Sequence, residues 1–331
     1  MKALVLKGVG QSVSLENVPD PKPGSGEAVV AIRCAALNHR DVWIQKGLYA
    51  GLKFPIILGS DGAGVVVETG SGVDPAWRGK EVIINPSIAW GDGERAQGKD
   101  FRILGLPDDG TFAERVKVPA TQLAAKPQHL DFAHAAALPL AGLTAYRALF
   151  SRAGLASGER VLVTGIGGGA ALFAFQFALA AGATVYVTSG SDRKLARAKE
   201  LGAAGGANYR NESWAEDLKD VGFNVIIDSA GGKGFTKLTN LAVPGGRIAF
   251  FGATMGNPPE LDLRRIFWKQ LSVLGSTMGS PADFAAMVRL VEQHKIQPLA
   301  ETVYPLSEGN QALIAMDNAK QFGKIILTIA P

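Results

Sequence analysis

The chain has 331 residues, of which 47% are hydrophobic and 19% are charged, and its formal net charge is +4. This composition is typical of a soluble globular protein with a large core, and the length is typical of two domains. Lys and Arg form no block or stripe, which argues against nucleic-acid and membrane-surface binding. The single cysteine, Cys34, excludes an internal disulfide and a cysteine-based metal cluster.

No targeting or membrane-spanning segment is recognisable in the sequence. The apolar run in MKALVLKGVG is too short for a signal peptide, and no stretch approaches the length of a membrane span. We therefore expect a cytoplasmic protein that binds neither nucleic acid nor a membrane.

The first part of the chain, residues 1–122, is predicted to be a compact, largely antiparallel β domain. Short apolar runs alternate with Gly and Pro, and strands are expected at 2–8, 26–37, 62–70, 80–86 and 112–119. Residues 38–49 are of another kind and contain the expected first helix. Residues 87–110 are polar and long for a loop, which is typical of a functional lobe or a mobile excursion.

From Leu123 the pattern changes to alternating helices and strands, and residues 123–278 are predicted to form a second domain. Asp131–Phe150 is alanine-rich and helical apart from a break near Pro139. Further strands are expected at 224–228, 247–251 and 271–276, and Ser191 can cap a helix that follows it. Repeated β-α units with apolar strands predict a doubly wound parallel sheet.

A glycine turn between a strand and a helix organises this second domain. The stretch 161–189 contains an apolar strand, the turn, an apolar helix that ends at Gly182, and a second strand. The turn lets backbone N–H groups and a helix N-terminus approach a pyrophosphate, so we expect dinucleotide binding, although a tight structural turn is the alternative. The turn residues expected at the cofactor are Gly165, Gly167, Gly168, Gly169 and Ala170.

The tail of the chain is expected to return to the first domain. It contains predicted helices at 281–296 and 306–320 and a last strand at 324–329. Residues 279–331 then complete the β domain, the second domain is an insertion, and the active site is expected in the cleft between the two.

The order of five motifs resembles the medium-chain dehydrogenase/reductase superfamily, and within it the zinc-free branch typified by quinone oxidoreductases. The motifs are NHRDVW, FPIILGSDGAGVV, ALPLAGLTAYRAL, the glycine turn and GKIILT. This resemblance implies an α/β protein with a GroES-like β-rich substrate domain and a Rossmann domain, a nicotinamide cofactor, and a homodimer formed by pairing sheet edges. The expected edge is Leu271–Ser276, and a loop that covers this edge is the alternative.

The zinc ligands of related alcohol dehydrogenases are missing. The first ligand position resembles Asn38, the family's G-H-E motif is Gly59-Ser60-Asp61, and the third position falls near Ala141 or Gly142. Such a set lacks the soft S and N donors that zinc usually takes. Residues 87–110 resemble the family's structural-zinc lobe without its cysteines, so a second interpretation is descent from the zinc-binding side with loss of both metals.

Without a Lewis acid, simple alcohol oxidation is disfavoured, whereas a conjugated acceptor delocalises the charge that hydride creates. The leading hypothesis is therefore NADPH-dependent reduction of a quinone or an α,β-unsaturated carbonyl. Asn38 is a candidate donor to the substrate oxygen, or a helix cap. Trp43 and Tyr49 fall where the family places rings around the substrate, or belong to the core. His39 and Asp41 are expected to be structural.

Cofactor choice is predicted from the end of the second strand. Ser189, Lys194 and Tyr209 match the family's 2′-phosphate pocket, and Arg193 can assist, so we expect NADPH. Asp192 is the dissenting residue, because it can bind a ribose or favour a helix N-terminus. The resemblance also assigns five other residues to the cofactor, namely Thr144, Phe251, Gly252, Ser276 and Lys324.

Two other functions stay open. An enoyl-thioester reductase should show a basic patch for the carrier's phosphate, and none is evident. A dinucleotide-binding redox sensor or structural protein would bind NADPH without turnover. The sequence identifies neither the substrate nor a proton donor.

Overall fold

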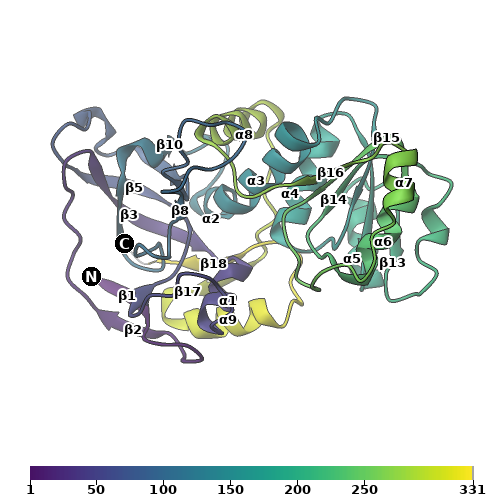
Figure 1. Ribbon diagram of the computed structural model, residues 1–331. Helices are drawn as coiled ribbons and strands as arrows, with labels where there is room; N and C mark the ends of the chain where they lie inside the picture. Colours follow the sequence, from purple (N-terminus) through teal and green to yellow (C-terminus); the bar gives the residue numbers. More distant parts are fainter. Residues whose placement is uncertain (330–331) are drawn as a thin grey trace. The chain divides into compact units, whose positions relative to one another are not determined.

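The computed structural model describes residues 1–329 and divides into two compact units (Figure 1). The first unit runs from Met1 to Ala141 and resumes at Gly279; the second is Gly142–Met278. Residues 123–141, expected in the second domain, therefore lie in the first. The reason is packing: β10 (Leu123–Ala125) pairs with a strand of the first unit, and α2 (Phe132–Ala137) packs its buried alanines on that unit's sheet. Residues 330–331 of the expected tail lie outside the described part.

The first unit is built on two mainly antiparallel sheets. The larger has the order β10-β6-β5-β3-β18-β17, with β9 also paired to β3, and the smaller has the order β2-β1-β4. All five strands that the sequence predicts in this region are present. Its other strands are β1 (Lys2–Leu6), β2 (Ser14–Asn17), β3 (Glu27–Ala36), β4 (Ile56–Ile57), β5 (Asp61–Thr69), β6 (Glu81–Ile84), β9 (Arg115–Pro119), β17 (Thr302–Pro305) and β18 (Ile325–Thr328).

The end of the chain shares the sheet of its beginning, because β18 pairs antiparallel with β3. The helix α9 (Gly309–Asp317) lies beside α1 (His39–Gln45), yellow against purple in Figure 1. The third long element of the tail is α8 (Pro281–His294), which begins with a capping box in which the Asp283 carboxylate accepts from the Ser280 backbone N–H at 2.9 Å. Asp61 begins β5, and Lys324 immediately precedes β18. Because β3 pairs with both β5 and β18, the two residues come into one region.

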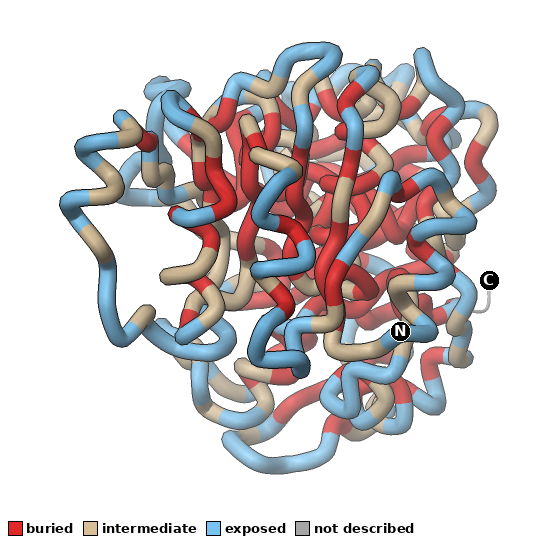
Figure 2. Tube along the Cα trace, turned by 90° about the vertical axis from the view of Figure 1, so that its right-hand side faces the viewer, coloured by how far each residue is buried: buried red, intermediate tan, exposed pale blue. Residues whose placement is uncertain are grey.

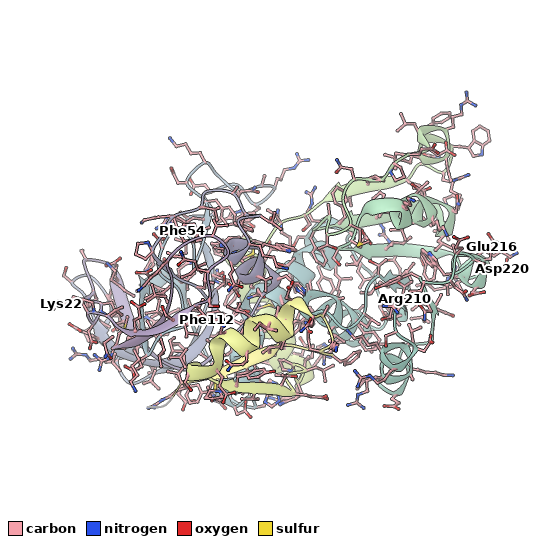
Figure 3. The ribbon with its side chains drawn as sticks, turned by 90° about the horizontal axis from the view of Figure 1, so that it is seen from below. Lys22, Phe54, Phe112, Arg210, Glu216 and Asp220 are labelled. Atoms are coloured by element: carbon pink, nitrogen blue, oxygen red, sulfur yellow. The ribbon has the colours of Figure 1, made fainter. Side chains whose placement is uncertain are left out.

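A tight core fixes the residues before β5. Phe112, labelled in Figure 3, is fully buried, and Gly59 approaches it with φ of +99°. A Cβ at Gly59 would strike the Phe112 ring and would lie 2.6 Å from Thr111 Oγ1. Glycine is therefore required here, and it sets the path of Ser60 and Asp61.

The lobe at 87–110 is held by an aromatic pair and by hydrogen bonds. Trp90 is buried and makes an edge contact with Phe101, with ring centroids 5.3 Å apart. Trp90 Nε1 donates to the Gly93 carbonyl at 2.9 Å, and Ser280 Oγ donates to the Glu94 carboxylate at 2.6 Å. Its two short strands are β7 (Ser87–Ile88) and β8 (Arg102–Ile103). These contacts hold a lobe that contains no cysteine.

The second unit is a parallel six-stranded sheet in the order β13-β12-β11-β14-β15-β16, which confirms the doubly wound prediction. Its two central strands, β11 and β14, carry apolar runs that are buried on both faces, and Figure 2 shows the buried segments of the chain in red. The strands are β11 (Arg160–Val163), β12 (Thr184–Ser189), β13 (Gly205–Asn208), β14 (Phe223–Asp228), β15 (Ala242–Phe250) and β16 (Ser272–Gly275).

In the helices and loops of this unit, the buried positions match the apolar residues. The helix α4 (Gly169–Ala180) is apolar almost all round, and most of its residues are buried against the sheet and the neighbouring π-helix. The loop 210–220 shows the opposite pattern: Arg210, Glu216 and Asp220, labelled in Figure 3, are exposed, whereas Trp214 between them is buried. The remaining helices are α3 (Pro139–Tyr146), which begins at the predicted break, the π-helix Arg147–Arg152, α5 (Asp192–Glu200), α6 (Gly232–Leu241) and α7 (Leu263–Trp268).

Over the described residues, no helix is both long enough and apolar enough to cross a membrane.

Candidate functional site

Parallel topology brings most of the predicted cofactor residues of the second unit to one edge of its sheet. The carboxyl ends of the strands share that edge, which is where doubly wound sheets bind ligands. The glycine turn follows β11, Ser189 ends β12, Tyr209 follows β13, Phe251 and Gly252 follow β15, and Ser276 follows β16. The fold therefore gathers residues that are up to about a hundred positions apart in the sequence.

The glycine turn has the backbone and the open space that a phosphate needs. Gly165 and Gly167 have φ of +67° and +122°, and Gly168 is the N-cap of α4. A Cβ at Gly168 would meet no atom within 4 Å, and one at Gly165 would meet only Ser229 Oγ at 3.9 Å. The turn is thus open above the first N–H groups of a twelve-residue helix.

Lys194 lies against this turn. A Cβ at Gly167 would lie 2.7 Å from Lys194 Cδ and 3.0 Å from its Nζ. Burial lowers the pKa of Lys194, and the neighbouring Arg193 charge lowers it further. A partly desolvated ammonium beside an N-terminal turn favours an anion at this place.

The end of β12 presents a buried serine rather than an acid. Ser189 Oγ accepts from the Ser191 N–H at 3.3 Å and donates to the Ile166 carbonyl at 3.4 Å. Tyr209 is half exposed, and its ring covers Gly190. Asp192 Oδ1 accepts from Asn208 Nδ2 at 2.8 Å, so the dissenting acid has a partner within the protein.

One buried acid at the carboxyl edge of this sheet, Asp228, was not among the residues predicted from the sequence. Asp228 ends β14; its Oδ1 accepts from Thr164 Oγ1 at 2.6 Å, and its Oδ2 accepts from the Gly231 N–H at 2.8 Å. Burial raises the pKa of Asp228, and these donors oppose the rise. Asp228 joins the loop after β14 to the residue that opens the glycine turn. An acid that closes an apolar strand (NVIID) was the available signal.

The hydroxyls of two residues expected near the nicotinamide, Ser276 and Thr144, differ in their contacts within the protein. Ser276 Oγ is buried and has no hydrogen-bond partner among the described residues, as expected of a group that meets a ligand. Thr144 Oγ1 lies 3.9 Å from the Met278 sulfur. The cofactor roles of these residues stay predictions.

A second cluster of polar side chains is buried in the first unit. Lys324 Nζ donates to Asn38 Oδ1 at 2.6 Å and to Asp61 Oδ2 at 2.9 Å, and Asn38 Nδ2 donates to Asp61 Oδ2 at 2.9 Å. Lys324 is 3% exposed and Asn38 is 7% exposed. Asn38 stands at the N-cap of α1 as its alternative role requires, yet its amide is used for this network. Lys324, expected at the cofactor, has Asn38 and Asp61 as its ammonium partners.

Asp41 and Arg40 extend the cluster. Asp41 Oδ2 accepts from the Asn38 N–H at 2.8 Å, whereas its buried Oδ1 has no hydrogen-bond partner among the described residues. Burial raises the pKa of Asp41 to about 6, with Asp61 contributing, while Arg40, the Asn38 N–H and Lys324 oppose the rise. Arg40 donates to Ser60 Oγ at 2.7 Å and to the Leu104 carbonyl at 2.8 Å, which ties α1 to the lobe. The role of Arg40 could not be predicted from the sequence, because its partners Ser60 and Leu104 are distant in the chain.

Of the two predicted aromatic residues, Tyr49 borders this cluster. The Arg40 guanidinium lies 5.0 Å from the centroid of the Tyr49 ring, a cation–π contact. The rings of Trp43 and His39 lie 6.1 Å apart. Trp43 and Tyr49 are half-buried, so each contributes to packing and keeps an exposed part.

The residues at the three expected zinc-ligand positions do not suit zinc. Asn38 and Asp61 already bind the Lys324 ammonium, and Ser60 Oγ donates to the Leu104 carbonyl at 2.7 Å. Near the third position, Ala141 and Gly142 carry no ligand side chain, and the neighbouring Leu140 N–H donates to Asp61 Oδ1 at 2.7 Å. Residues 1–329 contain no group of three or more His, Cys, Asp and Glu side chains that could hold a metal ion.

Comparison with known proteins gives consistent matches along the chain. Residues 24–128 match the model of the alcohol dehydrogenase GroES-like domain, and residues 169–293 match that of zinc-binding dehydrogenase. A zinc-type alcohol dehydrogenase-like protein of Leptosphaeria maculans is 36% identical over 96% of this chain and 94% of its own. An acryloyl-coenzyme A reductase of Metallosphaera sedula is 32% identical over 99% of this chain and all (100%) of its own.

A solved structure shares the whole fold. The crystal structure of an NAD-dependent alcohol dehydrogenase superposes with a TM-score of 0.94 at 37% identity and covers 100% of both chains. The GroES-like domain and the Rossmann-like parallel sheet expected from the sequence are therefore confirmed.

Proposed function

The chain belongs to the medium-chain dehydrogenase/reductase superfamily as an oxidoreductase, and we propose that it uses NADPH, without zinc, to reduce a conjugated acceptor. The acceptor is a quinone or an α,β-unsaturated carbonyl. The observation that carries this proposal is the buried Lys324 ammonium, which is bonded to Asn38, at the first expected zinc-ligand position, and to Asp61, the acid of the Gly59-Ser60-Asp61 motif.

Chemistry explains why this site favours a conjugated acceptor. Oxidation of a simple alcohol needs a Lewis acid that lowers the pKa of the hydroxyl, and no ligand set for one exists among the described residues. In a conjugated acceptor, the charge that arrives with hydride spreads over the carbon framework to an oxygen. A few N–H donors then suffice to stabilise it. The site that contains Asn38 offers such donors, and Trp43 and Tyr49 offer ring surfaces to a planar acceptor.

Cofactor binding is assigned to the carboxyl edge of the second unit's sheet. When bound, the reduced nicotinamide supplies hydride. The glycine turn receives the pyrophosphate on its N–H groups, Ser189, Tyr209, Arg193 and Lys194 receive the 2′-phosphate, and the unpartnered Ser276 hydroxyl hydrogen-bonds the nicotinamide end. The neutral Ser189 and the engaged Asp192 favour NADPH over NADH.

A second candidate is reduction of an enoyl thioester, which is itself an α,β-unsaturated carbonyl. The relative named acryloyl-coenzyme A reductase, which matches along its whole length, favours this candidate. A third candidate, a redox sensor that binds NADPH without turnover, is supported only by the absence of an evident catalytic acid.

An acceptor panel tests the proposal. The purified protein is mixed with NADPH or NADH and, in turn, with 1,4-benzoquinone, an enone, acryloyl-CoA, a simple aldehyde and a simple alcohol with the oxidised cofactor, and bound metal is measured. We expect oxidation of NADPH with the conjugated acceptors and no stoichiometric zinc. Activity confined to simple alcohols together with bound zinc would refute the proposal, and tight NADPH binding without turnover of any acceptor would favour the sensor.

The cofactor assignment has its own test. K194M should raise the KM for NADPH about tenfold, which corresponds to loss of one charge-assisted contact, and should leave the KM for NADH nearly unchanged. Lys199 is exposed on the same helix, so K199M is the matched control. A lower KM for NADH than for NADPH in the native protein would contradict the assignment.

We also propose a homodimer through the edge strand β16. This strand pairs with β15 on one side and ends the sheet, and the preceding helix α7 exposes Leu263, Phe267 and Trp268, the last at 82%. A second copy pairs the edge and covers these side chains. Light scattering should report a dimer that F267S/W268S converts to monomer, while L48S, at an exposed leucine of the first unit, leaves it intact. A native monomer would disprove the pairing.

A further inference from the structure

The ammonium of Lys324 is held in a buried site, formed by Asn38 and Asp61, that the sequence does not predict. It lies between Asn38, which precedes α1, and Asp61, which begins β5, and Lys324 itself immediately precedes β18. All three side chains are buried, with Asp61 fully so. A cation held at a fixed point by three separate segments is preorganised, because neither partner has to move to receive it.

The carboxylate that orients Lys324 is itself fixed. Asp61 Oδ2 accepts from Lys324 and from Asn38, and its Oδ1 accepts from the Leu140 N–H at 2.7 Å. Asp61 thus accepts three hydrogen bonds that fix both of its oxygens, and its charge holds the ammonium in place. Of the three N–H bonds of the ammonium, two point to partners among the described residues, which leaves one for a further acceptor.

We propose that Lys324 acts as the electrophile of this enzyme in the place of a metal ion. This inference rests on the proposed function. The third N–H of Lys324 donates to the carbonyl oxygen of the acceptor, and Asn38 and Asp61 are the positioning residues that hold the ammonium. Lys324 is thereby reassigned from the cofactor to the substrate oxygen.

The step is balanced with the cofactor already proposed. Hydride adds to the electron-poor carbon, the π electrons shift to the carbonyl oxygen, and the nicotinamide becomes oxidised. The oxygen gains negative charge. The Lys324 ammonium stabilises this charge through an N–H hydrogen bond and keeps its proton. Solvent water then donates the proton that completes the reduced product.

A buried ion pair with a purely structural role is the competing explanation, and the variants are chosen to separate the two. K324M removes the cation and leaves Asp61 without its partner, so it risks misfolding. D61N/K324M removes both charges together and avoids an unpaired buried carboxylate. K324R keeps a cation at the same position. Lys126, a partly buried lysine of the same unit whose side chain is 8% exposed and whose Nζ bonds Leu130 and Glu81, supplies the matched control K126M.

Two readouts distinguish an electrophile from a structural lysine or a cofactor ligand. The first is turnover of the acceptor panel, with the NADPH Kd measured separately by fluorescence. The second uses no cofactor: 4-nitrophenol is bound to the protein and titrated by its absorbance. Its oxyanion stands for the charged oxygen of the acceptor, so an ammonium in contact lowers the pKa of the bound phenol.

We expect folded D61N/K324M to lose about a hundredfold in kcat, the range for one oxyanion donor, while its NADPH Kd changes less than twofold. K324R should recover part of the activity, and K126M should match the native protein. The pKa of bound 4-nitrophenol should be lowered by native protein and by K126M, and not by D61N/K324M.

Three results would overturn the proposal. One is a folded D61N/K324M with native kcat. Another is an NADPH Kd that rises tenfold with unchanged kcat, which restores Lys324 to the cofactor. The third is that native protein fails to bind 4-nitrophenolate or leaves its pKa unchanged. If native protein reduces no acceptor, the proposed function fails, and the 4-nitrophenol titration still decides whether Lys324 faces an oxyanion.

Discussion

Replacement of Asp41 by asparagine should change how the stability of the first unit depends on pH. The Asp41 carboxyl is fully buried, and one of its oxygens has no hydrogen-bond partner among the described residues. Burial raises its pKa from 3.8 to about 6 against the opposing effects of Arg40 and Lys324. Asparagine keeps a carbonyl oxygen for the Asn38 N–H and removes the ionisable group.

The size and direction of the effect follow from this pKa. Between pH 4 and pH 6 the folded protein holds more protons at Asp41 than the unfolded chain, so the stability contributed by this group is greatest below pH 3.8 and is lost as the pH rises through 6. The shift is about two units, and each unit corresponds to about 1.4 kcal/mol. The free energy of unfolding of the native protein relative to D41N should therefore fall by about 2 kcal/mol between pH 4 and pH 7.5, because part of the change lies below pH 4.

Urea unfolding of both proteins across this pH range measures the difference. The matched control is D283N, which removes the equivalent capping-box carboxylate from α8, where Asp283 Oδ2 accepts from the Ser280 N–H. D283N measures how much free energy of unfolding is lost when a capping-box carboxylate is replaced by an amide. A difference between the native protein and D41N that stays constant with pH, or that grows as pH rises, would refute the assignment of a raised pKa to Asp41.

Three further substitutions test the glycine turn and the lobe. G167A combines a φ of +122° with a Cβ 2.7 Å from Lys194 Cδ, so it should lower the melting temperature and weaken NADPH binding at least tenfold in fluorescence titration. G168A has open space and an ordinary φ of −77°, so it should keep the native melting temperature and lose only cofactor affinity; equal behaviour of the two variants would contradict this account. W90A removes the buried ring that contacts Phe101 and should lower the free energy of unfolding by about 3 kcal/mol, with faster proteolysis within 91–100; native resistance would show that the aromatic pair does not hold the lobe.

Local patterns in the sequence were sufficient for most of the second unit. The apolar strand before Gly165, the glycine turn and the apolar helix after it depend on neighbouring residues, so their order alone predicts a βαβ unit. The elements that pattern reading left out, β2, β4, β10, β13, β17, α6 and α7, are mostly short or lack a clear period. The sequence predicts a domain boundary at residue 123, where the helical pattern begins, whereas the first unit extends to Ala141. Tertiary packing of α2 on the first unit's sheet decides that question.

The glycine turn and the parallel sheet expected from repeated β-α units follow from residues close together in the chain, and the lack of Cys and His at the expected zinc-ligand positions is read directly from the sequence. The partners of Lys324 were decided only by the tertiary structure. Its bonds to Asn38 and Asp61 span 286 and 263 residues, and they form because β18 pairs with β3 in the sheet that also contains β5. Hydrogen-bond partners at such separation leave no local pattern in the sequence, so the lysine that its motif assigns to the cofactor is found between Asn38, at the first expected zinc-ligand position, and Asp61.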